Sequence, residues 1–456
     1  MILARDVISA LDRICTNRCF TDPESLALYG YDATRISHTP DAVVFPQNTA
    51  EIADIVKLAG TRAIPLIARG AGTGLSGGSV PISGGIVVSM EKMDRIVSIS
   101  RTDLIAEVEP GVITGELKRR VSEVGLFYPP DPASSEFSSI GGNISENAGG
   151  LRAIKYGSTS NYVLGLEVVL PTGAVLWIGR HTHKGVVGFS LKDLFIGAEG
   201  TLGIITRAVL RLIPRPRTSS VLFATFRDAV ASASAVEDIL GTGILPSALE
   251  FMDHASMSAV AAYMGTGVFG DGAGAALLIE VDGIEEETAR AIDTMRAACG
   301  KEAVSTEVAH GQDAERLWTA RRALSPALTK IKPFRLNEDV VVPLSKLPDL
   351  VAGVHRIAMS LNLSYANFGH AGDGNIHVNV LYDEKDADEH KRALMAVDLL
   401  FDLVIGLGGT LSGEHGVGIT KLMYITKELS PAAHGLMKEI KRLVDPNNIM
   451  NPGKAI

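Results

Sequence analysis

The strongest constraint on the fold of this chain is a glycine-rich segment that directly follows a short apolar run. Residues 64–68, IPLIA, have the apolar and β-branched character of a buried strand. They lead into residues 69–79, RGAGTGLSGGS, where the many glycines leave consecutive backbone N–H groups unshielded by side chains. A concave row of such groups binds phosphate without a helix, so the segment predicts a nucleotide diphosphate site, with a plain turn as the alternative.

The same segment contains the spacing GxGxxG, at Gly72, Gly74 and Gly77. In a dinucleotide-binding Rossmann fold, this spacing opens a helix whose N-terminus faces the pyrophosphate. Here residues 78–85, GSVPISGG, follow, and their proline and glycines cannot form that helix. The sequence therefore argues against a nicotinamide-binding fold of that type.

Two further clusters of small residues lie later in the first half of the chain. Residues 128–132 read YPPDP and precede residues 140–150, IGGNISENAGG, and residues 197–203 read GAEGTLG. Loops made of small residues let the backbone approach a ligand closely. Because several such loops are separated in the sequence, we expect a large, flat cofactor rather than a small metabolite.

Short strands and helices alternate on both sides of a proline pair. Residues 42–46 predict a strand, residues 49–60 a helix with Thr49 as its N-cap, and residues 165–179 a hairpin. Pro214 and Pro216 interrupt any regular element, so we place a domain boundary there. We expect a first domain over 1–215, an α+β second domain over 216–420, and a C-terminal segment, 421–456, that returns to the first domain.

Composition excludes several classes of protein. The formal net charge is −9 and there is no basic run, so we expect no nucleic-acid partner. Three cysteines cannot form a disulfide framework or hold an iron–sulfur cluster. The first residues predict an amphipathic helix rather than a signal peptide, and the apolar run 395–407 is interrupted by Asp398 and Asp402. We therefore expect a cytoplasmic protein without a transmembrane segment.

The second half carries a candidate metal site. Residues 367–379, NFGHAGDGNIHVN, predict a hairpin about Asp373-Gly374 that brings His370 and His377 onto adjacent strands, within reach of one ion. Asn379 faces the same side as His377. In residues 412–418, SGEHGVG, glycines leave Glu414 and the neighbouring histidine unshielded. Two imidazoles and a carboxylate suit a divalent ion with open positions, and a polar loop satisfied by its own hydrogen bonds is the alternative.

An arginine in the second domain is a candidate for binding a substrate carboxylate. Residues 318–322, WTARR, lie in a predicted helix, and Arg321 is the first choice because a guanidinium offers a bidentate fork to a carboxylate. An exposed helical arginine is the alternative. Lys332 and Arg335 follow as further cations.

The first half of the chain contains five motifs in this order: RGAGTGLSGG, YPPDPASS, IGGNISENAGG, KYGS and GAEGTLGIIT. Because of these motifs, it resembles the FAD domain of the vanillyl-alcohol oxidase type of flavoprotein. From about Asp41 to Lys454, the chain is similar to the branch of D-lactate, glycolate and D-2-hydroxyglutarate dehydrogenases. The resemblance implies an α+β fold, with a two-subdomain FAD-binding domain and an α+β substrate (cap) domain. It also implies an FAD-dependent 2-hydroxyacid dehydrogenase.

The resemblance implies a set of FAD contacts, with the pyrophosphate on the first loop. No histidine lies between Arg69 and Ser79, so we expect non-covalent FAD. Ala198 and Ser190 depart from the serine and aspartate usual in the family. The implied cofactor residues are Arg69, Gly70, Ala71, Gly72, Thr73, Gly74, Leu75, Gly78, Ser79, Pro130, Asp131, Ser134, Gly141, Gly142, Asn143, Ser145, Gly149, Gly150, Tyr156, Glu199, Gly200, Ile204 and Asn451.

By the same match, His370, His377 and Glu414 are the metal ligands, of zinc first and of manganese or iron as alternatives, and His415 is the base. The related alkyl-ether-lipid synthases carry histidine where this chain has Glu414, which argues against that activity. We hypothesise that Arg321 binds the carboxylate of a D-2-hydroxy acid and that Asn379 belongs to the catalytic set. His415 would take the hydroxyl proton while hydride passes to flavin N5.

Substrate, electron acceptor and assembly are less constrained. D-Lactate and D-2-hydroxyglutarate are the first candidates, with glycolate as a further one. The acceptor would be a quinone, a cytochrome, an electron-transfer flavoprotein or an iron–sulfur subunit, and we expect a homodimer. Two other functions stay open: a zinc-dependent hydrolase, and a non-catalytic flavin-binding subunit for electron transfer.

Overall fold

The protein forms two compact units. The computed structural model describes residues 3–456 except 266, 270–271 and 301. Unit 1 comprises Met1–Gly149, Ser158–Arg215 and Glu414–Ile456, and unit 2 comprises Gly150–Gly157 and Pro216–Gly413. The sequence placed the start of the last segment at residue 421 and assigned residues 150–157 to the first domain. The structure differs at both positions.

Unit 1 contains a four-stranded sheet in the order β1-β2-β4-β3. β2 and β3 are both parallel to β4, and β1 is antiparallel to β2. The helix α3 forms the crossover between β2 and β3, two parallel strands that lie on either side of β4. The bounds are β1 Cys19–Phe20, β2 Ala42–Val44, β3 Leu66–Arg69, β4 Ile86–Ser89, α1 Arg5–Ile14, α2 Pro23–Leu28 and α3 Thr49–Arg62.

Helix α3 starts one residue earlier than its predicted cap implies. Asn48 is the N-cap, since its side chain accepts a hydrogen bond from the amide of Glu51 at 3.0 Å, so the prediction of Thr49 as N-cap was wrong. Thr49 is the first helical residue, and its hydroxyl donates to Glu167 instead. The apolar face of α3 joins β2, β3 and β4, the amphipathic α1 and the buried Met450 in one core.

A second sheet of unit 1 is antiparallel, in the order β5-β6-β10-β8-β9. β8 and β9 form the predicted hairpin, and β7 pairs separately with β11. The bounds are β5 Ile96–Ser100, β6 Ile105–Val108, β7 Leu126–Phe127, β8 Val163–Val169, β9 Val175–Gly179, β10 Ile204–Arg211, β11 Ile213–Pro214, α4 Thr114–Glu123, α5 Ile140–Glu146, η1 Thr159–Asn161, α7 Lys192–Phe195, η5 Leu422–Tyr424, α15 Ile425–Glu428 and α16 Pro431–Val444.

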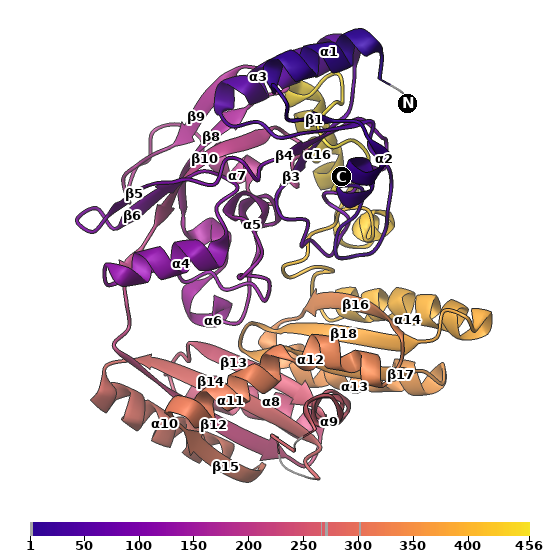
Figure 1. The fold of residues 1–456 in the computed structure, drawn as a ribbon. Coiled ribbons are helices and arrows are strands. Elements are labelled where there is room, and N and C mark those ends of the chain that lie inside the picture. The colour runs from indigo at the N-terminus through magenta and orange to yellow at the C-terminus, as the bar shows by residue number, and fades with distance from the viewer. Residues whose placement is uncertain (1–2, 266, 270–271, 301) are drawn as a thin grey trace. The chain divides into compact units, whose positions relative to one another are not determined.

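Unit 2 is built on a seven-stranded antiparallel sheet in the order β15-β12-β14-β13-β17-β18-β16 (Figure 1). Helices α8 and α10 pack against β12 and β14, and α14 packs against β16 and β18. The strands are β12 Thr218–Phe226, β13 Ala248–Asp253, β14 Ala275–Gly283, β15 Ala303–Ala309, β16 Phe334–Val341, β17 Ser364–His370 and β18 Asn375–Tyr382. The helices are α6 Ala153–Tyr156, α8 Ala229–Gly241, α9 His254–Met264, α10 Glu285–Cys299, α11 Gly311–Arg322, α12 Leu324–Ala327, η2 Leu328–Lys330, η3 Leu344–Lys346, α13 Leu347–Ser360, η4 Ala371–Asp373 and α14 Ala387–Gly406.

The apolar run that ends at residue 407 lies within and just beyond α14. Among the described residues, every helix is too short or too polar to cross a lipid bilayer. The faces of α14 differ, because Ala393, Val397 and Phe401 are buried while Leu394 and Met395 are exposed.

The buried N-cap of α9 gives unit 2 a pH-dependent stability. Asp253 is the last residue of β13, and its carboxylate accepts hydrogen bonds from the amides of Ser256 at 2.8 Å and Asn367 at 2.6 Å. Burial raises the pKa of Asp253 to about 6, although these hydrogen bonds lower it in part. The folded protein therefore binds a proton more tightly than the unfolded chain does.

We expect the free energy of unfolding to fall between about pH 4 and pH 6, by on the order of 3 kcal/mol, as Asp253 loses its proton in the folded state. Denaturant titrations across this range should show that Asp253→Asn removes the effect. The control is Asp228→Asn, at the N-cap of α8, whose pKa is lowered by the hydrogen bond from Ala231. An unchanged slope in Asp253→Asn would contradict the assignment.

Candidate active site

In unit 1, the amides and the carbonyls of the first glycine loop differ in their hydrogen bonding. Among the residues that the structure describes, the amides from Gly70 to Ser79 donate no hydrogen bond. The carbonyls of Gly74 and Ser76, by contrast, accept from Ala33 at 3.1 Å and Ile419 at 2.8 Å. A row of backbone donors directly after a strand fits an anionic diphosphate.

The loop is packed so closely that two of its residues have to be glycine. A Cβ at Gly70 would lie 2.2 Å from Oγ of Ser139, and one at Gly77, where φ is +84°, would lie 2.4 Å from Cγ1 of Ile419. Ser139 is also the N-cap of α5, accepting from the amide of Gly142 at 3.2 Å. The second cluster of small residues therefore forms a short helix that begins beside the first loop.

The C-terminal tail closes the same loop. The side-chain amide of Asn451 donates to the carbonyls of Gly78 at 2.8 Å and Glu199 at 2.7 Å, and the ammonium of Lys454 donates to Gly78 at 2.8 Å. Burial lowers the pKa of Lys454 to about 8, although nearby carboxylates, that of Asp32 first, partly offset this. Sequence reasoning missed Lys454, because a single lysine in a polar tail gives no local signal.

Glu199 holds the segment that follows His415. Its carboxylate accepts hydrogen bonds from the amides of Val417 at 2.8 Å and Gly418 at 2.7 Å, and burial raises its pKa. Glu146, which the sequence also missed, lies beside this turn, since a Cβ at Gly416 would come within 2.3 Å of its Oε2. The sequence predicted a cofactor contact for Glu199, and the structure shows a carboxylate that fixes the backbone next to His415.

The other implied FAD residues are divided between the units. Gly150 and Tyr156 belong to unit 2, where the Tyr156 hydroxyl donates to Asp282 at 2.8 Å. Asp131 forms an ion pair with Lys118 in unit 1. All the remaining implied residues lie in unit 1: Arg69, Gly70, Ala71, Gly72, Thr73, Gly74, Leu75, Gly78, Ser79, Pro130, Ser134, Gly141, Gly142, Asn143, Ser145, Gly149, Glu199, Gly200, Ile204 and Asn451.

The two histidines of the predicted hairpin lie on adjacent strands. β17 ends at His370, η4 makes the turn, and His377 lies in β18 opposite Phe368. One ligand atom each of His370, His377 and Glu414 lies within 4.8 Å of the others, and both histidines are buried. This set of donors fits a divalent cation such as zinc.

The residue before Glu414 is fixed by hydrogen bonds, and the Glu414 side chain packs near Gly149. Glu414 directly follows Gly413, whose amide donates to the carbonyl oxygen and to Oδ2 of Asp339, both at 3.0 Å. Within unit 1, the Glu414 side chain lies beside the predicted FAD loop, since a Cβ at Gly149 would be 3.3 Å from its Oε2. A larger residue than glycine at position 149 would therefore press on this ligand.

Arg321 has a partner that the sequence did not reveal. It is buried, and its Nε donates to Oε2 of Glu250 at 2.8 Å, while Oε1 of Glu250 lies 2.7 Å from Nδ1 of His370. Burial alone would raise the pKa of Glu250, but its interactions with His370 and Arg321 lower that pKa overall. The alternative of an exposed helical arginine is therefore wrong, because this guanidinium lies within unit 2 against a buried carboxylate.

Asn379 is fully buried in β18, and its side-chain nitrogen donates to the carbonyls of Ala366 at 3.2 Å and His377 at 3.1 Å. Among the described residues, its Oδ1 has no hydrogen-bond partner. This oxygen is therefore available as an acceptor beside His377. Lys332, by comparison, is paired with Glu389 at 3.1 Å.

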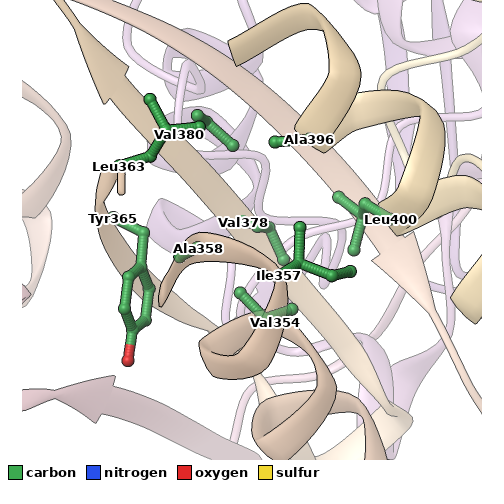
Figure 2. Close-up of a pocket in the computed structure, with 9 residues that line it drawn as sticks. All are labelled: Val354, Ile357, Ala358, Leu363, Tyr365, Val378, Val380, Ala396 and Leu400. Atoms are coloured by element: carbon green, nitrogen blue, oxygen red, sulfur yellow. The ribbon is translucent and has the colours of Figure 1, made fainter. Parts of the chain in front are cut away.

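An apolar pocket lies on the other side of the same sheet (Figure 2). Val378 and Val380 line it together with residues of α13 and α14. Successive residues of a strand point to opposite faces, so these valines alternate with His377 and Asn379. The pocket is thus separated from the histidines by the sheet, and its lining offers no metal ligand.

Comparison with known proteins gives the class and then the family. A solved p-cresol methylhydroxylase with substrate bound is similar at a TM-score of 0.81 and 18% identity, over 99% of this chain and 96% of that one, which shows a shared fold. The model of an FAD binding domain matches residues 40–179, and that of the C-terminal domain of FAD linked oxidases matches residues 215–455. The chain belongs to the family of FAD-linked oxidases.

Two relatives are similar over almost their whole length. The glycolate oxidase subunit GlcD of Bacillus subtilis is 42% identical, over 99% of this chain and 97% of the relative. A D-lactate dehydrogenase of Anaerostipes hadrus is 34% identical, over 96% of this chain and 92% of the relative. The resemblance read from the motifs, the α+β fold and the assignment as an FAD-dependent oxidoreductase are confirmed.

The tail provides a test of the FAD site. We expect Lys454→Met to weaken FAD binding by about tenfold or more, because a charge-assisted hydrogen bond to the loop is lost beside buried carboxylates. The measurement is the FAD dissociation constant, from flavin fluorescence on titrating the apoprotein. Lys438→Met, an exposed change in α16, is the control. Equal affinities in the two variants would contradict a role for the tail.

Proposed function

We propose that this protein oxidises a D-2-hydroxy acid to the 2-keto acid, with non-covalently bound FAD and one divalent metal ion. The observation that carries the proposal is the grouping of His370, His377 and Glu414 in a chain that belongs to the FAD-linked oxidases. The names of the two relatives support the same substrate class, since they specify glycolate and D-lactate. D-2-Hydroxyglutarate is the further candidate.

FAD, when bound, accepts two electrons and a hydrogen from the substrate carbon. In this proposal, the amides of the first glycine loop hold its pyrophosphate, and the tail with Asn451 and Lys454 keeps that loop in place. The loop from Arg69 to Ser79 offers no histidine for a covalent link. The chain's own contribution is therefore orientation and charge neutralisation rather than electron transfer.

Zinc, with manganese and iron as alternatives, would lower the pKa of a bound hydroxyl. His370, His377 and Glu414 would hold the ion with positions left open for substrate. His415 would accept the hydroxyl proton, and the Glu199 contacts with Val417 and Gly418 would fix its backbone during that transfer.

For the substrate carboxylate, Arg321 stays the proposed cation. Two of its donors are directed at Glu250, and the remaining N–H groups have no hydrogen-bond partner among the described residues. The free Oδ1 of Asn379 would accept a hydrogen bond beside the ion. Both residues would thus position the substrate from the face of the sheet that carries His377.

The other two hypotheses explain less of the chain. A zinc-dependent hydrolase would not explain the row of backbone amides in unit 1 that donate no hydrogen bond among the described residues. A non-catalytic flavin subunit would not need three ligands and a histidine base. The electron acceptor, among a quinone, a cytochrome, an electron-transfer flavoprotein and an iron–sulfur subunit, stays a prediction, as do the homodimer and the cytoplasmic location.

The test is a panel of 2-hydroxy acids assayed with an artificial electron-acceptor dye. We expect turnover with the D isomers of lactate or 2-hydroxyglutarate, or with glycolate, and bleaching of the flavin absorbance on adding substrate without dye. Dialysis against a chelator should abolish turnover, and zinc or manganese should restore it. A colourless protein that hydrolyses esters, or a flavoprotein that no 2-hydroxy acid reduces, would refute the proposal.

We expect His415→Ala to lower kcat by about 10²- to 10⁴-fold, because the hydroxyl proton then has no positioned acceptor. The FAD content and the metal content should stay those of the parent protein. His310→Ala, an exposed change whose side chain makes no capping bond, is the matched control. Normal turnover in His415→Ala would remove this residue from the mechanism.

A further inference from the structure

A buried carboxylate in unit 2 joins a predicted metal ligand to the predicted substrate arginine. Glu250 lies in β13, and the register pairs it directly with His370 of β17, so their side chains share one face of the sheet. One carboxylate oxygen lies 2.7 Å from Nδ1 of His370, and the other accepts from Nε of Arg321 at 2.8 Å. Glu250 is completely buried.

The chemistry of the contact fixes the tautomer of the histidine. An ionised carboxylate can only accept, so Nδ1 of His370 carries the proton and donates it to Glu250. The other ring nitrogen, Nε2, is then the one that would bind a metal ion. A carboxylate in this position orients the ring and increases the basicity of the metal-binding nitrogen.

Arg321 makes the buried negative charge tolerable. A carboxylate without a partner in a protein interior costs several kcal/mol, and a guanidinium that donates to it offsets this cost. The Arg321 guanidinium also lies over the ring of Phe368, with Cζ 5.1 Å from the ring centroid. Phe368 is paired with His377 across the hairpin, so the same strands position the arginine and both histidines.

We propose that Glu250 is a positioning residue, which sets the tautomer and orientation of His370 for metal binding and holds Arg321 in place. This inference rests on the proposed function, since it presupposes a metal ion on His370. The alternative is an ion pair that only stabilises the sheet and has no effect on metal binding by His370. The two readings differ in the metal affinity of the folded protein.

The chain offers a matched control on the neighbouring strand. Glu280 of β14 is paired with Ala248 of β13, is 4% exposed, and forms an ion pair with Arg152 at 2.6 Å. Glu250→Gln and Glu280→Gln therefore each neutralise a buried carboxylate that faces an arginine, in the same sheet. Only the first change removes an acceptor from a predicted metal ligand.

The experiment measures the Zn²⁺ dissociation constant of the FAD-loaded full chain by chelator competition, with the melting temperature of the metal-free form recorded alongside. We expect Glu250→Gln to weaken Zn²⁺ binding by about 10- to 100-fold, and Glu280→Gln to leave it unchanged while lowering the melting temperature comparably. Equal zinc affinity in folded Glu250→Gln and the parent protein would overturn the inference and leave the proposed function standing.

Two other results are decisive. If the parent protein itself binds no Zn²⁺, the metal part of the proposed function fails and this inference fails with it. If Glu250→Gln does not fold, Arg321→Lys replaces it, because this change keeps a cation while removing the planar donor that holds Glu250. A weaker zinc affinity in Arg321→Lys supports the inference, and an unchanged affinity overturns it.

Discussion

Both units depend on buried carboxylates whose partners lie far away in the sequence. In unit 1, the Glu199 carboxylate accepts hydrogen bonds from the amides of Val417 and Gly418. In unit 2, the Glu250 carboxylate contacts both His370 and Arg321. Removing such a charge from water is costly, so each carboxylate requires its donors to be in place. That requirement fixes the segments that carry the candidate catalytic and metal-binding groups.

The same logic explains why the glycine loop of unit 1 stays open toward a ligand. Several of its carbonyls accept hydrogen bonds from Ala33, Ile419 and the tail, while its amides have no hydrogen-bond partner among the described residues. Backbone donors held in this way suit an anion and do not have to reorganise on binding. The tail thus holds the proposed FAD loop although its residues lie near the other end of the chain, and unit 1 is accordingly assembled from three segments of sequence.

Much of the site could be read from local patterns. The turn Asp373-Gly374 brings His370 and His377 onto adjacent strands, and the density of glycine after β3 marks the phosphate loop, because turn and loop chemistry depend on neighbouring residues. The resemblance added the family, the ligand set and the FAD contacts. Local patterns failed at Thr49, where Asn48 offers the better acceptor, and at Arg321, whose carboxylate partner is 71 residues away.

The sequence by itself thus predicted the main strands, the glycine-rich loops, the hairpin histidines and a large, flat cofactor, since each follows from residue type and short spacing. Only the tertiary structure revealed three contacts. Glu199 accepts hydrogen bonds from the turn after His415, and Lys454 donates one to the glycine loop. Glu250 lies between Arg321 and His370. The reason is physical. The donor that pairs with a buried charge depends on strand register and on which distant segments of the chain lie side by side. Both are set by the packing of the whole core rather than by any local run of residues.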